Sequence, residues 1–305
     1  MGSLLNAPGP LYGAIGAGGT KMVCGIGSAE HGSLETARID TRDVPGTVRA
    51  IVDFFEGAKA RHGDMAAIGI ASFGPLDLDP ASPGFGRITT TPKPGWQGAD
   101  LPAALKHALA LPVGIDTDVN AAAWAETRYG AARGRNSAAY VTIGTGIGVG
   151  LSIDGHMVHG LGHPEAGHLL PRRNAGHEGF AGVCPYHGDC LEGLAAGPAI
   201  KAAWGASLAD LPADHRAFAI EADYIGQLCA TLILTVAPEH IVLGGGVMAQ
   251  ERLFPAIRAE TLRRLAGYAA PWADPAVAEA RITPPECTEP SGLIGAYLLG
   301  ERAAH

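Results

Sequence analysis

The segment G-A-G-G-T-K-M-V-C-G-I-G at 16–27 is repeated in outline by G-T-G-I-G-V-G-L-S-I-D-G at 144–155. Each segment joins one apolar run to another through glycines, which predicts two strands connected by a tight glycine-rich turn. The segments begin 128 residues apart, at 16 and 144, and we interpret them as an internal duplication. Two related α/β halves predict a cleft between them, where ligands usually bind.

The rest of the chain alternates apolar runs of strand length with stretches of helical spacing, the pattern of an α/β protein. Besides hairpins at 11–26 and 137–153, we expect strands at 34–39, 66–73, 113–116 and 241–243. We expect helices at 44–61, 101–109, 216–237, 253–265 and 291–302. The segment 162–193 is dense in His, Cys, Gly and charge and has little periodicity. We expect an insertion there that is organised by something other than a hydrophobic core.

The composition limits the classes of protein to consider. The chain has 305 residues, 47% of them hydrophobic, which is enough for one large domain or two medium ones. Its net charge is −8, and no run of Lys or Arg favours nucleic acid or a membrane surface as a partner. No stretch reaches the ~18 apolar residues of a membrane span, and residues 1–10 do not have the pattern of a secretory signal. We therefore expect a cytoplasmic protein whose five cysteines form no disulfide framework.

Cys184-x-x-His187-x-x-Cys190 places three soft or borderline metal ligands within seven residues, and His168 lies 16 residues before the first of them. Two thiolates and two imidazoles suit tetrahedral zinc. Gly182 and Gly188 allow the tight turns that such a knuckle needs. Four protein ligands leave no open position, so the zinc is expected to be structural. The alternative is that these residues meet in a loop by chance.

Three glycine-rich turns are candidates for binding phosphate, because backbone N–H groups in such turns can hold phosphate oxygens. The first two carry a threonine hydroxyl, and the first is followed by the cationic Lys21. The turns are Gly18, Gly19 and Thr20; Gly144, Thr145 and Gly146; and Gly244, Gly245 and Gly246. One such turn alone is more often just a turn, but three indicate a nucleotide that spans a cleft.

The segment I-D-T-D-V-N at 115–120 predicts a strand that ends at Asp118 and a helix that Asn120 caps. A carboxylate at a strand end can act as general base toward a sugar hydroxyl. The alternative is that both aspartates of the segment are turn and cap residues.

Glu165, His168 and Glu192 can make the directional hydrogen bonds that sugar hydroxyls require. If zinc binds one ring nitrogen of His168, the other nitrogen is oriented toward a ligand. The alternative is that both glutamates lie at the surface or only support the side chains that contact the ligand.

The remaining conspicuous residues receive structural interpretations. Cys24 lies in an expected strand and Cys229 in an apolar helix, so both are expected in the core. Trp96 either lines the mouth of the cleft or packs locally in an exposed loop. Cys287, in a Pro-rich loop, is assigned no role.

Eight motifs, in this order, resemble the ROK family of bacterial sugar kinases and above all its fructokinase branch. They are A-G-G-T-K at 17–21, S-F-G-P-L at 72–76, T-P-K-P-G-W at 91–96, T-D-V-N-A-A at 117–122, I-G-T-G-I-G at 143–148, H-P-E-A-G-H at 163–168, C-P-Y-H-G-D-C-L-E-G-L at 184–194 and G-G-G-V at 244–247. The resemblance implies an actin/hexokinase-like (ribonuclease H-like) duplicated α/β fold, with two domains around a central cleft. The domains it implies are 1–120 with 290–305, and 121–289 with a zinc-binding insertion at about 163–193.

The resemblance also implies a reaction, the ATP-dependent phosphorylation of a hexose at its 6-hydroxyl, with D-fructose giving D-fructose 6-phosphate. Asp118 would be the general base, and Mg²⁺ would come with ATP. The sugar contacts implied are Glu165, His168, Glu192, Gly74, Pro75 and Thr117. The first two glycine turns and Lys21 would hold phosphates, and Gly244, Gly245 and Gly246 would border the adenosine. The zinc ligands implied are His168, Cys184, His187 and Cys190, and a homodimer is expected.

Two positions depart from the family pattern. Gly16 stands where the family has an acidic residue that helps to order Mg²⁺ and water around the phosphates. Thr117 stands where many glucokinases of the family have Asn, which argues against glucose as the substrate. A kinase for mannose, glucose or an N-acetylhexosamine, and a sugar-binding protein of weak activity, remain alternatives. A repressor of this family is disfavoured, because the first hairpin begins within 20 residues and leaves no room for a helix-turn-helix.

Overall fold

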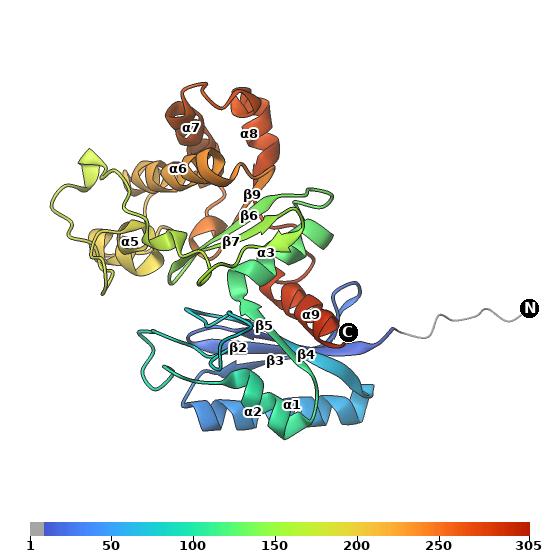
Figure 1. The fold of residues 1–305 in the computed structure, drawn as a ribbon. Coiled ribbons are helices and arrows are strands. Elements are labelled where there is room, and N and C mark those ends of the chain that lie inside the picture. The colour runs from blue at the N-terminus through green and yellow to red at the C-terminus, as the bar shows by residue number, and fades with distance from the viewer. Residues whose placement is uncertain (1–8) are drawn as a thin grey trace, which may run out of the picture. The chain divides into compact units, whose positions relative to one another are not determined.

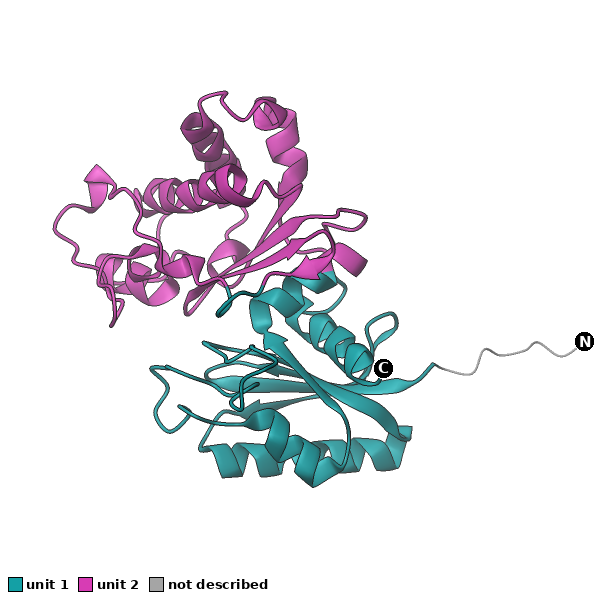
Figure 2. Cartoon of the chain, viewed as in Figure 1, with its two compact units in different colours: residues 1–125, 159–163, 287–305 teal, residues 126–158, 164–286 magenta. Residues whose placement is uncertain are grey.

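The computed structural model describes residues 9–305, and Figure 1 shows their fold. The chain divides into two units (Figure 2). The first unit contains the described residues up to Ala125, His159–His163 and Cys287–His305, and the second contains Glu126–Val158 and Pro164–Glu286. The excursion of five residues into the first unit was not expected from the sequence.

The sheet of the first unit has the strand order β3-β2-β1-β4-β5. The strands are β1 (Leu11–Ala17), β2 (Lys21–Ser28), β3 (Gly32–Asp40), β4 (Met65–Ser72) and β5 (Val113–Thr117). Strand β1 pairs antiparallel with β2 and parallel with β4, and β4 pairs parallel with β5. The three parallel strands therefore end at one edge of the sheet.

The sheet of the second unit has the order β10-β9-β6-β7-β8. The strands are β6 (Ala138–Ile143), β7 (Ile147–Ile153), β8 (His156–Met157), β9 (His240–Gly244) and β10 (Ile282–Thr283). Strand β6 pairs antiparallel with β7 and parallel with β9, as β1 does with β2 and β4. The same order and directions in both sheets confirm the internal duplication.

All the strands and helices expected from the sequence are present, and their bounds lie within two residues of those expected, except that the helix after β5 begins earlier. The helices are α1 (Val44–His62), α2 (Leu101–Leu109), α3 (Asp118–Tyr129), α4 (Leu191–Ala195), α5 (Gly197–Trp204), α6 (Ala217–Val236), α7 (Leu253–Leu265), α8 (Pro275–Arg281) and α9 (Ser291–Ala303). Helices α4, α5 and α8 were not expected from the sequence. These helices are short, with five to eight residues, and so show little periodicity.

In the first unit, α1 and α2 cover one face of the sheet and α9 covers the other (Figure 1). Helix α1 buries Ile51, Phe55 and Ala58, which recur on one side of a 3.6-residue helix. Helix α9 lies close against β4 because Gly69 has no side chain, and a Cβ atom there would collide with the carbonyl oxygen of Ala296. The final helix therefore belongs to the first unit.

In the second unit, α6 has the length and hydropathy of a membrane span, but 78% of its most apolar 18-residue stretch is buried inside the protein. It packs against α7 and contributes most of its side chains to the core of this unit. Burial of that extent is typical of a core helix.

The burial of Cys24, Cys229 and Trp96 tests what the sequence predicted for each of them. Cys24 and Cys229 are both fully buried, as expected. Trp96 is also fully buried, so neither a place at a cleft mouth nor an exposed loop is correct. Its ring packs against Phe73, and its Nε1 donates a hydrogen bond of 2.8 Å to the carbonyl of Arg42. This bond satisfies the polar atom of the indole and lets the side chain enter the core.

Candidate active site

Three predicted site segments of the first unit follow neighbouring parallel strands. Ala17, Ser72 and Thr117 lie in register across β1, β4 and β5. The first glycine turn, the Gly74-Pro75 loop and Asp118 come directly after these positions. Ligands of α/β proteins bind at the carboxyl ends of parallel strands, so this edge is the candidate catalytic edge.

The first glycine turn is closed by a hydrogen bond of 3.0 Å from the N–H of Gly18 to the carbonyl of Lys21. A Cβ atom at Gly18 would lie 2.7 Å from that carbonyl oxygen, so a side chain does not fit. A Cβ atom at Gly19 would meet nothing within 4 Å. The backbone at the tip of this turn is therefore open to approach by a phosphate group.

Asp118 is the first residue of α3, and Thr117 caps the helix. The Thr117 hydroxyl oxygen accepts from the N–H of Asn120 at 3.1 Å, which is the geometry of an N-cap. The prediction that Asn120 caps the helix is therefore wrong, because the cap is Thr117, three residues earlier, and the helix begins at Asp118. The Asn120 amide instead donates to the buried carboxylate of Asp116 at 2.9 Å.

Burial raises the pKa of Asp118 from 3.8 to about 6. A hydrogen bond of 2.9 Å from the N–H of Val119 favours the carboxylate, but it only partly offsets the loss of water. A carboxyl group with a pKa near 6 is ionised at neutral pH and takes up a proton more readily than an exposed aspartate. This is the property that a general base requires.

The second and third glycine turns lie side by side in the second unit. They follow β6 and β9, which are parallel neighbours and end at the same edge. Gly245 has a φ of +92°, and a Cβ atom there would collide with the carbonyl oxygen of Ile143. A Cβ atom at Gly144 would lie 3.8 Å from the N–H nitrogen of Gly246. The close approach leaves backbone groups of both turns at one place, which suits a nucleotide.

Glu192, on α4, contacts the second glycine turn directly. Its Oε2 accepts from the N–H of Ile147 at 2.9 Å, and a Cβ atom at Gly146 would lie 2.6 Å from the same oxygen. Glu192 therefore holds this turn in place. Its role as a sugar contact stays a prediction.

The four predicted metal ligands come together in the second unit. Nδ1 of His168 lies 3.4 Å from Sγ of Cys190 and 3.7 Å from Sγ of Cys184, which is also 3.7 Å from Nδ1 of His187. All four ligand atoms lie within 4.8 Å of one another. Ligands around tetrahedral zinc stand about 3.6 Å apart, given bonds of ~2.0–2.3 Å. The residues therefore fit a zinc ion.

The loop that carries these ligands is shaped by glycines, as predicted. Gly182 and Gly188 have φ values of +84° and +63°. Cys184 and Gly188 exchange two backbone hydrogen bonds, of 2.9 and 3.1 Å, which close the knuckle. Upstream, a 3₁₀ turn joins Glu165 to His168, whose N–H donates to the carbonyl of Glu165 at 3.0 Å. Glu165 is exposed.

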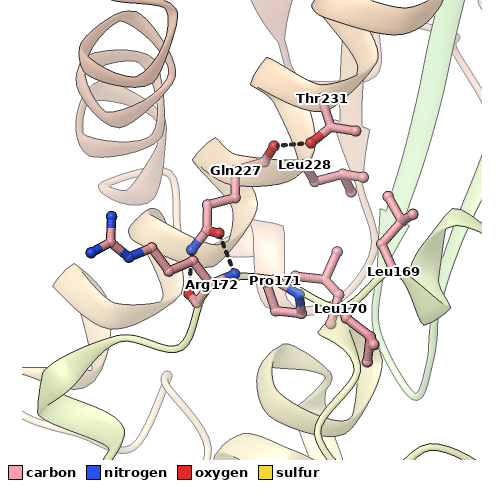
Figure 3. Close-up of a pocket in the computed structure, with 8 residues that line it drawn as sticks. Leu169, Leu170, Pro171, Arg172, Gln227, Leu228 and Thr231 are labelled. Carbon is pink, nitrogen blue, oxygen red and sulfur yellow. Dashed lines mark hydrogen bonds between the residues drawn. The ribbon is translucent and has the colours of Figure 1, made fainter.

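A cavity of about 190 Å³ in the second unit lies between α6 and the loop after His168 (Figure 3). Four of its eight lining residues are leucines, and Gln227 bonds the backbone of Arg172 twice, at 2.8 and 2.9 Å. None of the predicted site residues lines this cavity. It is therefore not part of the candidate active site.

Sequence reasoning missed three residues beside the candidate catalytic edge. Lys93 donates to the carbonyl of Thr41 at 3.2 Å, and Thr41 donates in turn to the carbonyl of Gly18. His159 contacts Asp116, two residues before Asp118, and His163 lies against Gly74. The motifs T-P-K-P-G-W and H-P-E-A-G-H contain Lys93 and His163, but spacing alone gives no sign of these contacts.

Comparison with known proteins decides the family. The model described as the ROK family matches residues 12–303. The chain belongs to the ROK family. Within it, the fructokinase of Zymomonas mobilis is 42% identical over 292 residues, 95% of this chain and 96% of that protein. The fructokinase of Pediococcus pentosaceus is 42% identical over 294 residues, 96% of this chain and 98% of that protein.

Solved structures of ROK proteins share the fold. The ROK hexokinase of Thermus thermophilus has a TM-score of 0.77 and 29% identity over 96% of this chain and 98% of its own. The ROK glucokinase of Streptomyces griseus, solved with glucose and AMPPNP, has a TM-score of 0.74 and 25% identity over 96% and 99%. These neighbours confirm the actin/hexokinase-like α/β fold that the sequence predicted.

Proposed function

We propose that this ROK protein transfers the γ-phosphate of ATP to the 6-hydroxyl of a free hexose, with D-fructose the preferred substrate. The observation that carries the proposal is the placement of Asp118, whose pKa burial raises to about 6. Asp118 follows β5, and the first glycine turn and the Gly74-Pro75 loop follow β1 and β4, which end in register with it. The two fructokinases at 42% identity support the choice of sugar.

In the proposed reaction, Asp118 accepts the proton of the 6-hydroxyl as its oxygen attacks the γ-phosphorus. The bond between the γ-phosphorus and the β,γ-bridging oxygen breaks, and ADP leaves. The N–H groups of Gly18–Thr20 and Gly144–Gly146, with Lys21, hold the phosphates, and Gly244–Gly246 border the adenosine. The Mg²⁺ that arrives with ATP neutralises phosphate charge.

The proposed sugar contacts are Glu165, His168, Glu192, Gly74, Pro75 and Thr117. His168 uses Nδ1 in the proposed zinc cluster, so its Nε2 is the atom available to a sugar hydroxyl. Zinc would thereby orient a sugar contact and stabilise the loop without taking part in the chemistry. We also infer a cytoplasmic homodimer from membership of the family.

The test is ADP release from Mg·ATP with fructose, mannose, glucose or N-acetylmannosamine. We expect the highest kcat/KM with fructose. A higher value with another hexose would keep the kinase and change its substrate. No turnover with any sugar, from folded protein that binds fructose, would support the alternative of a sugar-binding protein.

The rate should depend on pH through Asp118. Because the base must be ionised, kcat/KM for fructose should fall about tenfold per pH unit below about pH 6 and be level above it. The measurement is a pH profile of kcat/KM, which reports the free enzyme. A profile that is flat across pH 6 would contradict the assignment.

Gly16→Glu should lower the Mg²⁺ concentration that the enzyme needs to use ATP. A Cβ atom at Gly16 would lie 3.8 Å from the carbonyl oxygen of Val23 and 3.9 Å from its Cβ, so a side chain fits. A carboxylate near a hydrated cation contributes roughly 1 kcal/mol, so we expect the Mg²⁺ concentration for half-maximal rate to fall about fivefold. Gly16→Gln, which has the same shape without the charge, is the control. Equal Mg²⁺ requirements in the two variants would refute the idea.

A further inference from the structure

The five residues His159–His163, called the strap here, leave the second unit after Val158 and return to it at Pro164. Within the first unit, the strap has a histidine at each end. One histidine contacts the strand end before Asp118, and the other contacts the Gly74-Pro75 loop. The strap therefore contacts the Gly74-Pro75 loop and the strand end that precedes Asp118.

His159 contacts the carboxylate of Asp116, whose side chain is 1% exposed. Its Nε2 lies 3.1 Å from Oδ1 and 3.0 Å from Oδ2. The amide of Asn120 donates to the same Oδ1 at 2.9 Å. The carboxylate of Asp116 can only accept, so Nε2 of His159 carries the proton in this contact. The amide nitrogen of Asn120 lies 3.2 Å from the same Nε2, so the three side chains form one cluster. Asp116 and Asn120 lie two residues before and two residues after Asp118.

In His163 the Nε2 atom is a hydrogen-bond acceptor, whereas in His159 it is a donor. Its Nε2 accepts from the N–H of Leu76 at 3.0 Å, so this nitrogen carries no proton. A Cβ atom at Gly74 would lie 3.2 Å from Cε1 and 3.3 Å from Nε2 of the ring. The ring therefore covers Gly74 and fixes the loop that leads from Gly74 to Leu76.

We propose that His159 and His163 are positioning residues for the transfer, His159 for the base Asp118 and His163 for the sugar loop at Gly74-Pro75. The proposal rests on the proposed hexose kinase function. His159 holds the junction of β5 and α3 through Asp116 and Asn120. His163 holds the loop through the backbone of Leu76. The two histidines act on different kinetic constants, because one supports the chemical step and the other supports sugar binding.

For His163, the decisive pair of variants is His163→Leu and His163→Gln. Leucine removes the acceptor, and we expect the KM for fructose to rise about tenfold, the effect of losing one buried hydrogen bond. The kcat and the KM for ATP should stay within about twofold, since the base is untouched. Glutamine offers a side-chain oxygen to the N–H of Leu76 and should restore most of the fructose KM.

For His159, leucine removes the donor to Asp116 and should lower kcat about tenfold or more, because a small displacement of the base is costly. The KM for fructose should change little. His159→Gln keeps an N–H donor and should recover part of kcat. His156→Leu is the matched control, because His156 is exposed on β8 and its Nδ1 lies 2.9 Å from the carbonyl oxygen of Asp154, within the second unit.

These experiments distinguish failure of the strap proposal from failure of the proposed kinase function. If the wild type phosphorylates fructose and both leucine variants keep its constants, the strap proposal is overturned. It is also overturned if glutamine rescues neither constant or if His156→Leu causes the same losses. If the wild type phosphorylates no hexose, the proposed function fails, and calorimetry with fructose tests the strap instead. His163→Leu should then bind fructose about tenfold more weakly than the wild type, and equal binding would overturn the proposal.

Discussion

Asp118→Asn is expected to lower kcat for fructose phosphorylation by a factor of about 10²–10⁴, the usual contribution of a general base. Asparagine has almost the shape of aspartate, and its side-chain oxygen can still accept from the N–H of Val119. The variant therefore removes the basic atom and leaves the helix start intact. ATP binding, measured by calorimetry, should be close to that of the wild type, because the phosphate turns are unchanged.

The same variant should not be less stable than the wild type. Burial raises the pKa of Asp118 from 3.8 to about 6, so the folded protein holds this proton more tightly than the unfolded chain. The ionised group then destabilises the fold by on the order of 3 kcal/mol at most. This cost is absent below pH 3.8, grows as pH rises to about 6 and is complete above it. Thermal melts at pH 7 should place the Tm of Asp118→Asn at or above that of the wild type.

Asp154→Asn is the control, since Asp154 lies in an exposed turn between β7 and β8 of the second unit. It should keep the wild-type kcat. An Asp118→Asn enzyme with kcat within tenfold of the wild type would remove Asp118 from the mechanism. A large loss of kcat together with a large fall in Tm would show damage to the fold instead of loss of the base.

Cys190→Ser is expected to abolish zinc binding and to lower the free energy of unfolding more than any other variant proposed here. Cys190 is fully buried, and its Sγ lies 3.4 Å from Nδ1 of His168. The loop around it leaves Leu170, Val183 and Tyr186 exposed, so a metal ion would supply much of the energy that holds it. A loss of about 4 kcal/mol corresponds to a fall in Tm of roughly 8–16 °C.

Cys287→Ser is the matched control, because Cys287 is a half-buried cysteine outside the metal cluster. Elemental analysis should find one zinc per chain in the wild type and in Cys287→Ser, and none in Cys190→Ser. The KM for fructose should also rise in Cys190→Ser, since His168 loses the atom that orients it. Unchanged zinc content, or equal melting temperatures of the two variants, would refute a structural zinc.

The elements with local signals could be predicted from the sequence. The hairpins at Gly18–Thr20 and Gly144–Gly146 follow from glycines between apolar runs, and the duplication follows from their likeness. The metal cluster was predicted because three of its ligands lie within seven residues, which leaves little freedom in how they meet. Each of these features depends on neighbours in the chain.

Features that depend on distant partners could not be predicted. Trp96 lies in a loop, and its burial depends on its packing against Phe73 and on its bond to the carbonyl of Arg42, 54 residues away. The strap has no periodicity, and its histidines contact residues 43 and 87 positions away. The cap of α3 was misplaced because Thr117 and Asn120 are both good cap residues, and sequence alone does not fix the first turn.

The most direct test of the account is to identify the product made from fructose carrying ¹³C at carbon 6 and Mg·ATP, by NMR. We expect one ADP for each fructose consumed and a carbon-6 signal split by phosphorus, with neither seen for Asp118→Asn on the same timescale. A phosphate on another carbon, or no fructose-dependent ADP from folded protein, would contradict it.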